Sequence, residues 1–273
     1  MHIITPDGID LGKTKTPVTI LHCLSHTSGF GGEKNVSMTD EDRETIQNTI
    51  KCYIKAGLDF EPATKQAYSA FAAFDVLAAI VEIVTKQDYA EFLKNEIFLP
   101  CNMINTTFSP TEEQWEHIVM MHNKVEGKND VGITYQGCIF DRFPCAHKLA
   151  GAGLVSTLDD YSNFAQMLLN KGVFGDKRIV SEETLKRMSK VYVSEEIMEG
   201  YQRWGLGVRV VTDEQYRYLP IGSYGWSGAY GSHFWIDPEN NICAVFMKNS
   251  KFDGGSGNQS AGRFEKAVFE ALV

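Results

Sequence analysis

Apolar residues recur every three or four positions through the first two thirds of the chain, a spacing that predicts helices. The predicted helices cover residues 39–56, 70–86, 88–98, 158–170 and 181–188. Gly57 and Pro100 are typical helix stops, and Thr39 with Asp42 resembles a capping box with the shorter acid. Residues 101–153 follow no regular pattern, which predicts a long loop with short elements. We expect the inward stripes to be Ile46, Ile50, Tyr53 and Ile54; Phe74, Leu77, Val81 and Val84; Tyr89, Phe92, Leu93 and Ile97; and Tyr161, Ala165 and Leu168.

The apolar period changes to two in the last third of the chain. Residues 205–211, 230–236 and 242–247 alternate as strands do, and the turn-forming residues 237–241 join the last two into an antiparallel hairpin. A terminal helix, residues 261–272, places Phe264, Val268 and Leu272 on one face that can pack over the hairpin. Helices followed by antiparallel strands predict an α+β fold. We expect one domain over 1–273, with a mainly helical lobe at 16–200 and a sheet with its terminal helix at 201–273.

Composition narrows the class of protein. The 273 residues are 43% hydrophobic and 22% charged, which is typical of a globular domain rather than a disordered chain. The net charge of −9 argues against nucleic acid as a partner, because such binding needs clustered lysine and arginine. We see no apolar run of the ~18 residues that suggest a membrane span and no cofactor motif. Residues 1–10 lack a leader pattern, which predicts the cytoplasm if residue 1 is the true start.

Two groups of metal-ligating residue types have simpler explanations. The six cysteines form no C-x-x-C pair, so we expect reduced, buried thiols, although Cys138 and Cys145 could form a disulfide. His22 and His26 lie one helical turn apart, but no Glu follows His22 and no third ligand is evident. We therefore predict structural histidines at a helix end, and no metal. Gly254, Gly255 and Gly257 lie in a linker rather than a phosphate loop, because no Lys follows them.

Six segments, in order, resemble the serine β-lactamase-related family, which includes class C β-lactamases, penicillin-binding-protein-like enzymes and β-lactamase-fold esterases. Residues 17–30 (P-V-T-I-L-H-C-L-S-H-T-S-G-F) resemble its T-I-x-x-L-L-x-H-T-S-G segment. The resemblance implies a β-lactamase/transpeptidase-like fold in which a helical lobe and an antiparallel sheet share a groove. Residues 60–70 resemble the family's Tyr-x-Asn segment, residues 92–103 resemble its I-F-x-P-L-G-M segment, and residues 150–157 resemble its A-G-G-L-x-S-T segment. Residues 225–229 resemble the family's Lys-Thr-Gly or His-x-Gly strand, and residues 234–238 continue that strand.

The nucleophile of that family is missing from this sequence. The family's chemistry uses a serine three residues before a lysine, one helical turn apart, and no Ser-x-x-Lys or G-x-S-x-G occurs among the 273 residues. In the family the nucleophile's helix precedes the H-T-S-G segment, which here begins near the start of the chain. We therefore expect the N-terminal strands and the nucleophile helix to be absent. Two interpretations stay open: a chain that starts late, and a natural relative without the nucleophile.

The remaining site residues are carried over from the resemblance. Tyr68 matches the motif tyrosine, which helps to move the serine proton, although a buried tyrosine at a helix start is the simpler interpretation. Trp226 stands where the family has Lys or His. It cannot bind a substrate carboxylate with a cation, and Ala70 replaces the motif Asn, so both departures favour esters or amides over a strict β-lactamase. Trp226 could instead only fill space against the sheet.

The rest of the predicted substrate strand is Ser227, Gly228 and Ala229. Gly228 lets a substrate lie against the strand, and the Ala229 N–H would be one oxyanion donor. The resemblance implies a serine hydrolase that acts through an acyl-enzyme on a small ester, amide or β-lactam. The alternative is a non-catalytic binding module that keeps only the groove. An exposed strand edge, left by missing N-terminal strands, would permit self-association.

Overall fold

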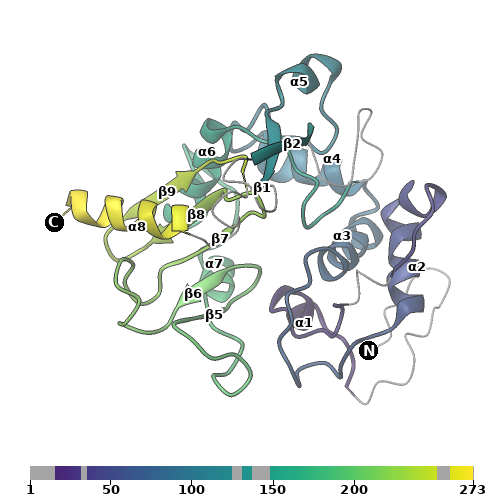
Figure 1. Cartoon of the computed structure of the whole chain (residues 1–273), viewed down its shortest axis with the longest axis horizontal. Helices are drawn as coiled ribbons and strands as arrows, with labels where there is room; N and C mark the ends of the chain where they lie inside the picture. Colours follow the sequence, from purple (N-terminus) through teal and green to yellow (C-terminus); the bar gives the residue numbers. More distant parts are fainter. Residues whose placement is uncertain (1–15, 32–35, 125–130, 137–147, 251–258, 273) are drawn as a thin grey trace.

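The computed structural model describes residues 16–31, 36–124, 131–136, 148–250 and 259–272. Among these, α1, α2 and α3 lie together on one side of the molecule and the main sheet lies on the other (Figure 1). The helical elements are α1 (Ile20–Leu24), η2 (Glu41–Arg43), α2 (Ile46–Ala56), α3 (Ala72–Thr85), α4 (Tyr89–Leu93), η3 (Lys94–Phe98), α5 (Glu112–His117), α6 (Leu158–Leu169), α7 (Glu182–Met188) and α8 (Gln259–Leu272).

The main sheet has five antiparallel strands in the order β5-β6-β7-β8-β9. Helix α6 lies against β8 and β9 and forms one core with them, and α8 covers the sheet through Phe264, which touches Trp235 and Phe246. The strands are β1 (Met120–Lys124) and β2 (Val131–Gln136), which pair; β3 (Val173–Phe174) and β4 (Lys177–Arg178), which pair; and β5 (Gln202–Trp204), β6 (Arg209–Val211), β7 (Tyr224–Ser227), β8 (His233–Asp237) and β9 (Ile242–Phe246).

The α+β prediction is confirmed, and so is the β8–β9 hairpin. The turn of the hairpin forms because one carboxylate oxygen of Asp237 accepts the backbone N–H groups of Glu239 and Asn240, and Asn241 takes a left-handed conformation with φ 57°. The β1–β2 pair, the β3–β4 pair and the short strand β5 were not predicted. Strand β6 is shorter than the predicted 205–211, because Gly207 has φ 73° and the chain bends between β5 and β6.

The predicted capping box forms, but it caps a different element. The backbone N–H of Thr39 donates to Asp42, and the N–H of Asp42 donates back to Thr39 Oγ1. These bonds stabilise the short turn η2, and the α-helix begins later, where the side chain of Thr45 accepts from the N–H of Asn48. Gly57 ends α2 with φ 82°, as expected of a glycine stop.

The predicted inward stripe of α3 is wrong. Val84 is 75% exposed, and Phe74, Leu77 and Val81 are only half-buried. The residues of α3 that are buried are mostly small: Ala72, Ala73, Asp75, Val76, Ala78 and Ala79. Apolar residues occupy all sides of this helix, so spacing could not select the face, and small side chains let α1 and α2 approach closely. Leu272 of α8, predicted to face inward, is likewise 62% exposed.

His22 has the structural role expected of it, and two of the four described cysteines are buried as predicted. His22 completes a capping box on α1, since its Nδ1 accepts from the N–H of Thr19. Within the described ranges, no three His, Cys, Asp or Glu side chains gather as metal ligands would. Cys23 and Cys101 are buried thiols, whereas Cys52 and Cys243 are half-buried ones. Cys138, Cys145 and the segment 254–257 lie outside the described residues.

Candidate active site

The loop that carries Tyr68 is held by the segment that resembles H-T-S-G. His26 is 1% exposed, and its Nδ1 accepts the backbone N–H of Ser69 at 3.1 Å. The carbonyl of His26 also accepts the N–H of Ala67 at 3.1 Å. Gly29 has φ 85°, and a Cβ there would collide with the carbonyl of Phe60. The segment therefore positions the residues on both sides of Tyr68 by direct backbone contacts.

Tyr68 lies in this loop, shortly before α3 begins at Ala72, and not at a helix start as predicted. Its side chain is 47% exposed, so it is not the buried tyrosine of the simpler interpretation. Ser69, which follows it, is completely buried, and its Oγ accepts the N–H of Ala73 at 3.1 Å. The loop thus presents Tyr68 outward while Ser69 anchors the backbone beneath it.

The structure brings Tyr68 and Trp226 together, although they are 158 residues apart in the sequence. The indole Nε1–H of Trp226 donates to the Tyr68 hydroxyl at 3.3 Å, and the two ring centroids lie 5.3 Å apart. Trp226 belongs to β7, and Tyr68 belongs to the helical part. The two parts of the fold therefore meet at these side chains, as the predicted shared groove requires. Whether the two residues act in catalysis remains a prediction.

Two further residues lie where the helical part meets the sheet, here called the junction, and neither was predicted from the sequence as a site residue. Trp204 of β5 is completely buried, with ring centroids 4.2 Å from His26 and 4.6 Å from Trp226. Arg209 of β6 lies opposite Trp204 in the strand pair, with its guanidinium 5.0 Å from the Trp204 ring and 5.5 Å from the Trp226 ring. A cation is therefore present beside Trp226, although Trp226 itself replaces the family's Lys or His. Trp204 lies just outside the predicted strand 205–211, and nothing in the pattern of that strand marked Arg209 as a site residue.

The electrostatics of this junction follow from burial and from Arg209. Burial lowers the pKa of His26 to about 4, and the positive charge of Arg209 acts in the same direction. His26 is therefore neutral at physiological pH, which suits its Nδ1 for accepting the Ser69 N–H. Burial also lowers the pKa of Arg209, an effect that the nearby Tyr216 and Tyr68 oppose.

The other predicted substrate residues continue from Trp226. The Oγ of Ser227 lies 2.7 Å from Nδ1 of His233, which connects Ser227 to strand β8. Gly228 begins a tight turn in which its N–H donates to the carbonyl of Ser232, and a Cβ at Gly228 would collide with Ser232 Oγ. Ala229 lies within this turn and is exposed. Substrate binding by Gly228 and an oxyanion contact from Ala229 remain predictions.

The segment 150–153 packs against the backbone at the end of the Tyr68 loop. A Cβ on Gly151 would collide with the carbonyl of Ala70, and the N–H of Ala150 donates to the buried carboxylate of Asp75 at 2.9 Å. The close approach of these two backbones requires glycine at position 151. The sequence pattern A-G-A-G therefore has a structural reason at the base of the site.

Gly151→Ala should destabilise the protein by about 1–3 kcal/mol, because the added methyl group must push against backbone atoms. The matched control is Gly262→Ala in α8, where a Cβ meets nothing within 4 Å. Removing that helical glycine should stabilise by about 0.5–1 kcal/mol. Equilibrium unfolding in urea measures both changes, and equal effects of the two substitutions would contradict the close approach.

Comparison with known proteins agrees with this architecture. The family model described as Beta-lactamase matches residues 6–264. A putative D-alanyl-D-alanine carboxypeptidase of Escherichia coli O157:H7 is 25% identical over 264 residues, covering 88% of this chain and 58% of the relative. The chain therefore spans less than two thirds of the length of this curated relative.

Solved structures share the fold. EstCE1, a hydrolase with promiscuous acyltransferase activity, superposes with a TM-score of 0.75 at 23% identity, covering 96% of this chain and 73% of EstCE1. The octameric penicillin-binding protein homologue from Pyrococcus abyssi gives 0.69 at 23% identity, covering 94% and 56%. The fold and junction define a β-lactamase/transpeptidase-like protein. The chain belongs to the serine β-lactamase-related family.

Proposed function

We propose that the protein is a serine hydrolase that acts through an acyl-enzyme on a small ester, amide or β-lactam. The substrate would lie along Tyr68, Trp226, Gly228 and Ala229. The observation that carries this proposal is the contact between Tyr68 and Trp226, because it joins the family's motif tyrosine and substrate strand across the two parts of the fold. The relatives whose names describe hydrolysis of D-alanyl peptides and acyl transfer support this reaction class.

The residues around the contact favour esters and amides. Trp226 and Ala70 stand where many family members have a cation and an amide, and Trp226 offers an apolar ring with one N–H donor. Arg209 lies beside the indole and supplies positive charge near Tyr68.

No Ser-x-x-Lys occurs among the 273 residues, so where the nucleophile of this reaction lies is a prediction. The test therefore begins with the genomic sequence upstream of Met1. An in-frame Ser-x-x-Lys supports the hydrolase. A stop codon directly upstream supports the alternative function, a non-catalytic binding module that keeps the substrate groove. The lack of a Ser-x-x-Lys motif among the 273 residues is the observation behind this alternative.

With that segment joined to the chain, the protein should hydrolyse ethyl butyrate, an ester of an alkyl alcohol. Tyr68→Phe should then lower kcat by about 10²–10⁴-fold, as loss of a general base does. Tyr192→Phe removes the same hydroxyl from a half-buried tyrosine between α7 and β5 and should leave kcat unchanged. Equal rates for the Tyr68→Phe variant and the unchanged protein would contradict a catalytic role for Tyr68.

A further inference from the structure

A second hydrogen-bonded set of polar side chains lies between β7, β8 and α8. Ser227 and His233 are cross-strand partners, with Ser227 Oγ 2.7 Å from His233 Nδ1. The other ring nitrogen of His233, Nε2, lies 2.9 Å from Oε1 of Glu265. All three residues are largely shielded, with exposed fractions of 7% for Ser227 and, for the side chains, 10% for His233 and 3% for Glu265. The order serine, histidine, carboxylate is that of a catalytic triad.

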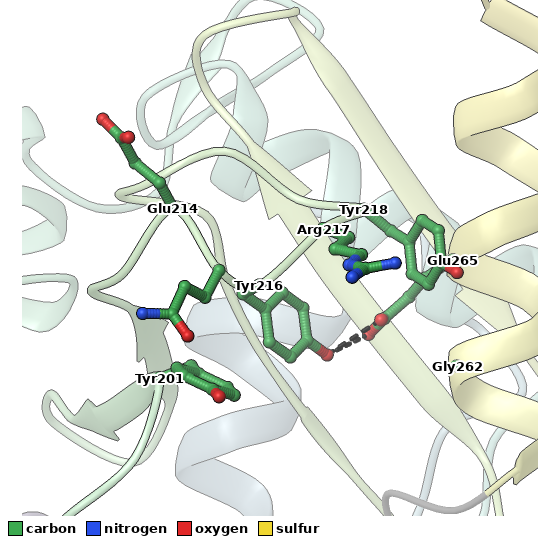
Figure 2. A pocket seen from close by; sticks show the side chains of 8 residues that line it. Tyr201, Glu214, Tyr216, Arg217, Tyr218, Gly262 and Glu265 are labelled. Carbon is green, nitrogen blue, oxygen red and sulfur yellow. Dashed lines mark hydrogen bonds between the residues drawn. The ribbon is translucent and has the colours of Figure 1, made fainter.

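The hydrogen bonds of Glu265 favour the tautomer of His233 that carries its proton on Nε2, which leaves Nδ1 free to act as a base. The hydroxyl of Tyr216 donates to both carboxylate oxygens of Glu265, at 3.0 and 2.8 Å, as the dashed line in Figure 2 shows. Burial and the Glu265 charge raise the pKa of Tyr216, so it remains a donor. A carboxylate held in this way accepts the Nε2–H of His233. Nδ1 is then left with its lone pair toward Ser227, which is the arrangement that a general base for a serine requires.

These residues line a space suited to a small acyl group. A cavity of about 290 Å³ is bounded by Ser227, His233, Glu265 and Arg209. The Nε of Arg209 is buried and has no hydrogen-bond partner among the described residues, which leaves a cationic donor for an oxygen that becomes negative.

A larger cleft of about 610 Å³ adjoins this cavity, with Tyr216, Gly262 and Glu265 on the walls of both. Figure 2 shows the rings of Tyr201, Tyr216 and Tyr218 along this cleft. Aromatic walls suit a ring on the leaving group of a substrate. Trp226, which precedes Ser227 on β7, also lines the smaller cavity, so the cavity reaches the junction with Tyr68.

We propose that Ser227, His233 and Glu265 form a second acyl-accepting site that takes short acyl groups from aryl esters. Ser227 Oγ attacks the carbonyl carbon while its proton passes to Nδ1 of His233. The C–O bond to the phenol breaks, and the phenol oxygen takes the proton from Nδ1. Water then attacks acyl-Ser227 in the same way, returning the proton to Ser227 Oγ and releasing the carboxylic acid. This site uses residues of the present chain alone, so it does not depend on the proposed function.

The test uses the chain of 273 residues and a fluorophosphonate carrying a rhodamine reporter. Ser227 Oγ would attack phosphorus, fluoride would leave, and His233 would take the proton. We expect one covalent adduct by intact mass, located at Ser227 by peptide mapping. Ser227→Ala should abolish the adduct. Glu265→Gln, which keeps the shape and the bond from Tyr216, should slow labelling by at least about 10-fold, and His233→Gln by about 100-fold or more.

Ser223→Ala is the matched control. Ser223 is as buried as Ser227 and directly precedes β7, but its Oγ has no hydrogen-bond partner among the described residues and therefore no base to activate it. This variant should label at the rate of the unchanged protein. Far-UV circular dichroism of each variant shows whether it is folded.

Three results would overturn the proposal. They are no adduct on the folded, unchanged chain, an adduct on a different serine, and an unchanged labelling rate in folded Glu265→Gln. If the three side chains only tie α8 to the sheet, their substitution lowers the unfolding midpoint and the unchanged chain takes no label.

Discussion

Trp204→Ala should destabilise the protein by about 3–5 kcal/mol, the usual cost of removing a fully buried tryptophan. The indole is 0% exposed and touches His26, Trp226 and the guanidinium of Arg209. Its removal would leave a cavity where the helical part meets the sheet. The contact between Tyr68 and Trp226 should loosen at the same time, since both rings lie beside Trp204.

Trp204→Phe separates ring packing from the indole N–H. The Nε1–H of Trp204 is buried without a partner among the described residues, so its loss costs little hydrogen bonding. This variant should therefore lose less than half as much stability as Trp204→Ala. Equilibrium unfolding in urea measures both. A loss below about 1 kcal/mol for Trp204→Ala would show that the junction is not packed around this ring.

Stability should fall by about 3 kcal/mol as pH decreases from 6.5 toward 4, because of His26 alone. The pKa of His26 is about 4 in the folded protein, against 6.5 for an ordinary histidine. Between these values the unfolded chain binds a proton at His26 that the folded chain does not. Acidification therefore favours unfolding in this window, and the effect saturates below about pH 4, where both states are protonated.

His26→Asn isolates this contribution. Asparagine tolerates the left-handed backbone at position 26, where φ is 56°, and its Oδ1 can replace Nδ1 as acceptor for the Ser69 N–H. The variant should lose ring packing at every pH, but its stability should depend less on pH between 6.5 and 4. Urea midpoints across this range give the comparison, and parallel pH profiles for the two proteins would contradict a neutral, buried His26.

Helices that have a capping residue and one polar face could be predicted from the sequence. The first and last residues of a helix, and the face that it buries, could not always be predicted. Thr157 caps α6, and Ala165 and Leu168 are buried as predicted. The buried face of α3 was predicted wrongly because alanines and larger apolar residues occupy all sides of this helix. The position of Tyr68 on a loop was missed because the loop is held by His26, a contact over 43 residues that periodicity does not encode.

The candidate site likewise contains some residues that could be predicted from the sequence and others that could not. Tyr68 and Trp226 could be paired in advance only because both belong to segments that resemble one family. Trp204 lies just before the predicted strand 205–211 and Arg209 lies within it, but the roles of both residues depend on the strand pairing itself. The link from Ser227 to His233 and Glu265 needs the register of β7 on β8 and the placement of α8 over the sheet. Residue types alone do not fix any of these contacts.

The central claim is that Tyr68 and Trp226 form a substrate site, and the indole N–H resonance of Trp226 reports on it most directly. The chain would be titrated with ethyl butyrate, which is not an aryl ester, and followed by ¹⁵N-¹H correlation spectra, with Trp226→Phe used to assign the signal. We expect the Trp226 signal to shift with saturation while that of Trp115 on α5 stays fixed, and Tyr68→Phe to weaken the binding. A Trp226 signal that stays unchanged while the ester binds elsewhere would contradict the account.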